Sequence, residues 1–174
     1  MIKHLTIILL VLIPFITRAQ EYIKTDETTS DGRIVETKPY AFFSNGKMYL
    51  MGFSYLKGEK YEAYMATVVS TGQSSQWEVP AGEQAVFKMA KGNRIALKSI
   101  IESTSEYEAP NDYTITSSYI IPVAKAPDML DAIKEVFVYM KNDGTSDIIN
   151  IKVPYDAASY LMLSYLELLS ITGR

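Results

Sequence analysis

The chain has 174 residues, and its 17 lysines and arginines against 20 acidic residues give a formal net charge of −3. This mild acidity gives no sign of the basic stripe or patch with which nucleic-acid-binding domains contact phosphates, so we expect no nucleic-acid partner. The single histidine is His4 and cysteine is absent, which excludes Ser-His-Asp catalysis, Cys-His catalysis and Cys/His zinc sites from the rest of the chain.

The first residues, MIKHLTIILLVLIPFITRAQ, have the pattern of a secretory signal peptide. Lys3 supplies a positive start, residues 5–16 form an apolar core, and Thr17-Arg18-Ala19 is a small-x-small cleavage site. This core is shorter than the roughly 20 residues of a spanning helix, although a retained membrane anchor is the alternative. We expect cleavage after Ala19, which would give a secreted or periplasmic protein with no transmembrane segment in the mature chain.

Residues 20–174 are predicted to form one domain, because a chain of this length can bury a core without disulfides. Residues 25–32 are polar and are expected to form a loop. Two strands, residues 33–43 and 48–56, are predicted on either side of Ser44-Asn45-Gly46-Lys47, since Asn-Gly accepts the positive φ angles of a tight hairpin. The second strand, MYLMGFSYL, is apolar on both faces and is expected to be covered on both sides.

Further strands are indicated by residues of alternating polarity between turn signals. They cover residues 61–71, 77–79, 84–90, 94–103, 113–123, 135–141 and 147–153.

Two helices complete the prediction, one short helix at about residues 126–133 and a C-terminal helix at about residues 154–171. Pro154 can begin the second helix, and Gly173 stands where it would stop. Strands and helices do not alternate regularly along the chain. We therefore predict a mainly β (α+β) fold, an antiparallel β-sandwich or open β-roll of about eight or nine strands.

The C-terminal helix is predicted to have one narrow polar stripe formed by Asp156, Ser159, Glu167 and Ser170. Its leucines spread around the remaining surface, so it needs more than one apolar neighbour. Either it packs lengthwise on the sheet, or part of its apolar surface stays exposed and docks a second protein or a membrane.

Residues 77–140 resemble small, uncharacterised secreted or periplasmic β-rich domains of Bacteroidetes-type bacteria. The resemblance lies in the pattern of WEVPAGEQAVFKMAKGNRIALKS followed by YTITSSYIIPVAKAPDMLDAIKEVFVYM. The leader ending Thr-Arg-Ala-Gln is similar to signal peptides from the same group. The resemblance implies compartment and architecture, and it carries over no functional residue.

Aromatic residues are the first candidates for a ligand site. The chain has 13 tyrosines and a single tryptophan. Trp77, Tyr49, Tyr55 and Tyr64 could form an exposed platform that stacks on sugar rings. The alternative is that the tyrosines are the half-buried residues common in antiparallel sheets.

Acidic residues are the second candidates. Glu102, Glu106, Glu108 and Asp112 could supply oxygen ligands to calcium, or could simply form a solvated acidic loop in residues 104–112. Residues 142–147 also resemble a calcium loop superficially, but a plain hairpin turn explains them better.

Pairs of carboxylates could perform hydrolysis, with Glu59 and Glu62 or Glu106 and Glu108 as nominal candidates. We nevertheless favour a non-enzymatic binding domain without a cofactor, which engages an envelope protein through the C-terminal helix. Carbohydrate binding through surface tyrosines and tryptophan is the alternative, and hydrolysis by paired carboxylates is third.

Overall fold

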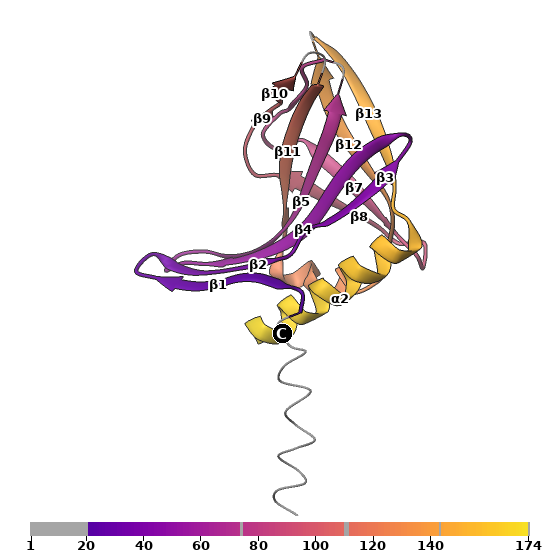
Figure 1. Ribbon diagram of the computed structural model, residues 1–174. Helices are drawn as coiled ribbons and strands as arrows, with labels where there is room; N and C mark the ends of the chain where they lie inside the picture. The colour runs from indigo at the N-terminus through magenta and orange to yellow at the C-terminus, as the bar shows by residue number, and fades with distance from the viewer. Residues whose placement is uncertain (1–20, 74, 110–111, 143, 174) are drawn as a thin grey trace, which may run out of the picture.

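A computed structural model of the chain describes residues 21–73, 75–109, 112–142 and 144–173. The predicted leader lies outside the described residues. The described chain is mainly β, with one large open antiparallel sheet, a short 3-10 helix η1 (Val123–Met129) and the C-terminal helix α2 (Tyr155–Thr172) (Figure 1). The predicted fold class, an open antiparallel β architecture with a C-terminal helix, is confirmed.

The sheet has 13 strands, more than the sequence indicated. The order is β1-β2-β4-β5-β11-β8-β7-β12-β6-β9, with β3 beside β4, β10 beside β11 and β13 beside β12. The strands are β1 (Ile23–Thr29), β2 (Gly32–Thr37), β3 (Tyr40–Ser44), β4 (Lys47–Lys57), β5 (Glu62–Gln73), β6 (Glu78–Val79), β7 (Gln84–Met89), β8 (Arg94–Ser99), β9 (Ser103–Thr104), β10 (Glu106–Ala109), β11 (Asp112–Ile121), β12 (Ile133–Asn142) and β13 (Thr145–Lys152).

Two segments that were expected to be loops contain strands instead. Residues 25–32 belong mostly to β1, which pairs with β2, and residues 104–112 include β10, which pairs with the start of β11. Both strands have one strand neighbour and largely exposed residues. Without a buried face a strand shows no alternation of polarity, so the sequence pattern missed them.

The strand expected at residues 33–43 is divided at Lys38 and Pro39 into β2 and β3, which pair with the two halves of β4. Pro39 has no N–H to donate to a ladder. At this break, the Thr37 hydroxyl accepts a hydrogen bond from the Phe53 N–H (2.8 Å) and lies 3.1 Å from the Phe53 carbonyl oxygen, to which it donates. The Thr37 side chain therefore supplies partners for both backbone groups of Phe53 where the ladder is interrupted.

The predicted turn at Asn45 and Gly46 is confirmed. Asn45 has a φ of 52° and Gly46 a φ of 77°, and β3 and β4 pair on either side, with Ser44 opposite Lys47. The hairpin between β12 and β13 is also present, with Asn142 opposite Thr145. Asp143, which the predicted turn includes, lies outside the described residues.

The core lies on the inner, concave side of the sheet. On β4 the side chains of Tyr49, Met51, Phe53 and Tyr55, at alternate positions, are buried. On the opposite face Ser54 is buried and the leucines are half-buried, but Met48 is 37% exposed. The prediction of a strand fully covered on both sides is therefore wrong, because no second layer of the described chain packs over its outer face.

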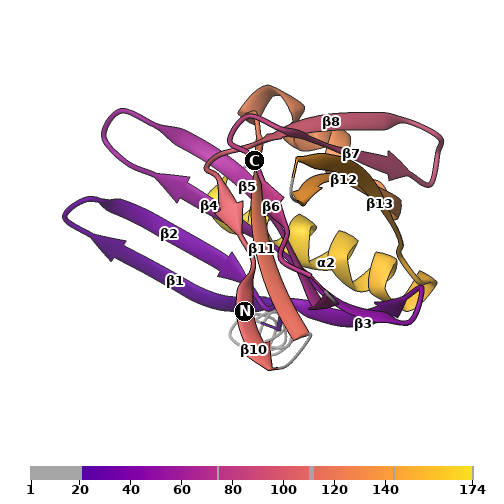
Figure 2. The ribbon, with the colours of Figure 1, turned by 90° about the horizontal axis from the view of Figure 1, so that it is seen from above.

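Helix α2 lies across one end of the curved sheet and packs against β4, β12, β2 and β3 (Figures 1 and 2). It ends at Gly173, which has a left-handed φ of 81°. The short helix is shifted from the predicted residues 126–133 to η1, and its residues Ala126 and Met129 are buried. No helix within the described ranges has both the length and the apolar character to cross a membrane.

The two strand edges β3 and β13 face each other without forming a ladder. The Lys152 N–H donates to Ser44 Oγ (2.9 Å), and Asn45 Nδ2 donates to the Asn150 carbonyl oxygen (3.0 Å). Side-chain hydrogen bonds thus join the edges of an open sheet. We refer to these two contacts as the β3–β13 seam.

Candidate functional site

Three of the four aromatic residues predicted to stack on sugars lie in the core. Tyr49, Tyr55 and Tyr64 have exposed fractions of 1%, 2% and 0%. The ring centroids of Tyr55 and Tyr64 lie 5.0 Å apart in a tilted contact. Because these rings occupy the inner side of the sheet, they cannot stack on a ligand in solvent, and the predicted tyrosine platform is wrong.

Trp77 differs from the tyrosines, because it borders a surface hollow. The backbone N–H of Trp77 donates to Ser105 Oγ (2.7 Å), and the backbone carbonyl of Trp77 accepts from the backbone N–H of Ser105 (2.8 Å). These bonds fix the backbone immediately before β6, beside the turn that joins β12 to β13. That turn lies at the end of the sheet away from α2 (Figure 1).

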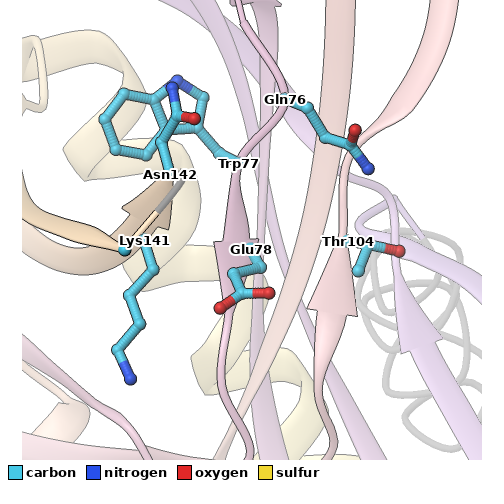
Figure 3. A pocket seen from close by; sticks show the side chains of 7 residues that line it. Gln76, Trp77, Glu78, Thr104, Lys141 and Asn142 are labelled. Carbon is cyan, nitrogen blue, oxygen red and sulfur yellow. The ribbon is translucent and has the colours of Figure 1, made fainter.

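The first hollow beside Trp77 has a volume of about 300 Å³ and a mostly polar lining. Its remaining walls are formed by Gln76, Glu78, Thr104, Lys141, Asn142 and Gly144 (Figure 3).

Most of these polar side chains have no partner within the hollow. Lys141 stands opposite Glu78 in the register of β12 and β6, and the two side chains extend in the same direction in Figure 3. Within the described ranges neither side chain takes part in an ion pair or a hydrogen bond. The Asn142 amide donates to Ser75 Oγ (2.9 Å) and is held in place. The hollow therefore presents one carboxylate and one ammonium group that are available to a ligand.

A second hollow of about 260 Å³ also borders Trp77 and lies under the β3–β13 seam. Lys47, Gln73 and Asp147 are among its lining residues. Lys47 Nζ donates to Gln73 Oε1 (2.5 Å), and the Gln73 amide also bonds the Ser70 hydroxyl. This hollow, too, has one acidic and one basic side chain.

The acidic residues predicted to bind calcium are not gathered around one point. Glu102 and Glu106 line a hollow beside β11, whereas Asp112 Oδ1 accepts a hydrogen bond from the Gly72 N–H (3.1 Å). The side chain of Glu108 lies outside the described residues. Among the side chains that are described, no group of three or more acidic residues could hold a metal ion.

The carboxylate pairs nominated for hydrolysis do not share a cleft in the described chain. Glu59 is exposed in the turn between β4 and β5, at the tip of a projecting arm (Figure 1). Glu62 Oε1 accepts a hydrogen bond from the Tyr55 hydroxyl (2.9 Å). The second pair involves Glu108, whose side chain is not described.

On the outward side of α2, two residues of the predicted polar stripe, Asp156 and Ser170, are exposed, and two leucines are exposed beside them. Leu163 and Leu166 are 44% and 50% exposed. Glu167 instead faces the start of the described chain, where its Oε2 accepts a hydrogen bond from the Tyr22 N–H (3.2 Å). Burial raises the pKa of the Glu167 carboxyl. Glu167 is half-buried, because the segment leading into β1 covers this side of the helix.

An apolar hollow of about 300 Å³ lies between η1 and the end of α2. Leu169, which follows Leu166 by three residues and so lies on the same side of the helix, is part of its wall. Leu130 borders the hollow and is 39% exposed. We define the α2–η1 surface as Leu163, Leu166 and the lining of this hollow, which is Val123, Ala124, Ala126, Pro127, Leu130 and Leu169.

Sequence reasoning did not identify the walls of these hollows. The leucines of the C-terminal helix indicated an apolar surface. The η1 residues of the α2–η1 surface could not be predicted, because they come from a distant part of the chain. Around Trp77 the only signal was the tryptophan itself, because Glu78 and Lys141 meet through strand pairing that the sequence does not specify.

Comparisons of the chain with protein-family models, with curated proteins and with solved structures gave no match. The resemblance to secreted domains of Bacteroidetes-type bacteria stays a prediction from sequence pattern.

Proposed function

We propose that this protein is a secreted or periplasmic, non-enzymatic binding domain that engages a protein partner through the α2–η1 surface. The observation that carries this proposal is the pair of exposed leucines on α2, Leu163 and Leu166, near an apolar hollow that Leu169 of the same helix borders. Single exposed leucines are common on protein surfaces, whereas a contiguous apolar patch is typical of an interaction site.

A protein is a better partner for this surface than an anionic membrane. Helix α2 contains Asp156 and Glu167 and has no lysine or arginine, so it lacks the basic face of membrane-surface helices. The hollow beside Leu169 instead suits an inserted apolar side chain of a partner segment. The expected partner therefore presents apolar side chains to α2.

The non-enzymatic part of the proposal rests on the residues themselves. No histidine follows His4 and no cysteine is present, which removes the commonest proton shuttle and the thiolate nucleophile. Of the nominated carboxylate pairs, Glu59 is exposed in the β4–β5 turn and Glu62 accepts a hydrogen bond from the Tyr55 hydroxyl. The compartment is inferred from the leader pattern.

A photo-crosslinking amino acid at Leu130 tests the proposal in the native envelope. We expect a discrete adduct with a protein other than this chain. Leu163→Glu combined with Leu166→Glu should abolish it, because two charges on the contact surface disfavour burial. Since both leucines are substantially exposed, the double variant should unfold at nearly the wild-type temperature.

Two controls make the result specific. Ile148→Glu alters an exposed apolar residue on β13, 47% exposed, and should leave the adduct intact. A crosslinker at Tyr61, 56% exposed in the β4–β5 turn, should not give the same adduct. An adduct that survives the double α2 variant, or that contains only two copies of this chain, would contradict the proposal.

A further inference from the structure

We propose a second binding site, independent of the α2–η1 surface, in which Trp77 and its two hollows bind a neutral saccharide. This site lies at the other end of the sheet from α2 (Figure 1). Its elements are the indole of Trp77, one polar hollow that holds Glu78 and Lys141, and a second hollow of mixed polarity.

The indole is the apolar component of the site. Trp77 is half-buried against the core, and both hollows use it as part of their wall. The backbone N–H and carbonyl of Trp77 are both hydrogen-bonded to Ser105, so the backbone that carries the indole has a defined position. A pyranose ring has an apolar C–H face that can pack on such an aromatic surface, with its hydroxyls directed to the polar wall.

The charges of the lining favour a neutral ligand. The first hollow has Glu78 and Lys141, and the second has Asp147 and Lys47, so acid and base balance in each. An anion would be repelled by the carboxylate and a cation by the ammonium group. Sugar hydroxyls both donate and accept hydrogen bonds, so they can pair with both kinds of group.

The two hollows set the expected size of the ligand. Each is near the lower end of the about 300–1,000 Å³ typical of small-molecule pockets. Because they share Trp77, neighbouring rings of an oligosaccharide can contact both. We therefore expect disaccharides and trisaccharides to bind more tightly than the corresponding monosaccharides.

Tryptophan fluorescence gives a direct test, because Trp77 is the only tryptophan in the chain. The full chain, expressed with its leader and purified as the host processes it, is titrated with glucose, mannose, xylose and N-acetylglucosamine and with oligosaccharides of each. At least one series should give a saturable change of emission, strongest for the oligosaccharides.

Conservative variants connect the signal to the site. Glu78→Gln should weaken binding by about tenfold, because a hydrogen bond to a charged acceptor is lost. Asn142→Ala should also weaken saccharide binding. Glu59→Gln makes the same change as Glu78→Gln in the distant exposed turn and should leave binding unaltered. Circular dichroism of each variant checks that the sheet is intact. Isothermal titration with Trp77→Phe provides a readout that does not depend on fluorescence.

Three results would overturn the proposal. The first is the absence of a saturable change with any of these saccharides. The second is binding that Glu78→Gln and Asn142→Ala leave unaltered. The third is a response only to glycine or alanyl-alanine, controls that carry both an ammonium and a carboxylate, since a zwitterion would then be the ligand that pairs with Glu78 and Lys141.

Discussion

The hydroxyl of Tyr119 is the buried group with the clearest consequence for stability. This residue of β11 is completely buried, and burial raises the pKa of its hydroxyl to about 12, with the nearby Ser117 hydroxyl opposing the shift. In the unfolded chain the pKa is about 10, so at high pH the unfolded state loses the proton first. The free energy of unfolding should therefore be unaffected by this group below pH 10 and fall between about pH 10 and about 12.

Urea unfolding from about pH 9 to about pH 11.5 measures this loss. Tyr119 alone should contribute a decrease of about 1.4 kcal/mol per pH unit above pH 10. Tyr119→Phe should flatten the profile without abolishing the decrease, because burial also raises the pKa of Tyr165. Tyr61→Phe, which removes a hydroxyl from an exposed ring, should reproduce the wild-type profile. Equal slopes for Tyr119→Phe and wild type would refute the argument.

Single residues show what the sequence could and could not predict. Asn45 and Gly46 specify their turn by themselves, since their backbone preferences are local, and the turn was predicted correctly. Thr37 was not noticed, because its hydroxyl acts only when Phe53 of another strand is brought beside it. The sequence does not distinguish a strand tyrosine that faces solvent from one that faces the core. Tyr49 and Tyr64 lie in the core.

At the level of elements, the β3–β13 seam predicts a local weakness. The Lys152 N–H has Ser44 Oγ as its acceptor, and Ser44 is only 6% exposed. Ser44→Ala leaves this donor without its partner, which should cost about 0.5–1.5 kcal/mol. Hydrogen exchange at the Lys152 amide should become faster. Ser30→Ala in the exposed β1–β2 turn should change neither quantity, and unchanged exchange at Lys152 after Ser44→Ala would show that the seam does not depend on this bond.

The elements also show why the predicted strand count was too low. Most strands recognised from sequence have one buried face, as β4 has with Met51 and Phe53, although the largely exposed edge strand β13 was recognised too. The strands that were missed lie at edges with mostly exposed side chains, so their apolar pattern is absent although their backbone pairing is regular. The bounds of α2 were predicted well. Which of its residues face solvent could not be predicted, because Glu167 is covered by Tyr22 from the start of the described chain.

For the whole molecule, the arrangement separates two surfaces of opposite character. The α2–η1 surface is apolar and lies at one end of the curved sheet, and the polar hollow beside Trp77 and the β12–β13 turn lies at the other (Figure 1). The β13 strand connects them, since it runs from the turn beside Asn142 to the start of α2. Neither surface needs the other in order to be occupied, so a protein partner and a saccharide could be bound together.

The fate of the predicted leader bears on whether the proposed α2–η1 surface can meet a protein. Tyr22 is bound to Glu167 of α2 and, through its carbonyl, to the Lys38 N–H (2.7 Å). A retained leader would therefore hold α2 close to the membrane. We expect intact mass and N-terminal sequencing to show a chain that starts at Gln20 in the periplasmic or extracellular fraction. Ala19→Arg should leave an uncleaved, membrane-associated chain, because signal peptidase requires a small residue at this position, whereas Thr17→Ser should be processed normally. A wild-type chain that begins at Met1 in the membrane fraction would instead support the anchor alternative and place α2 at the lipid surface.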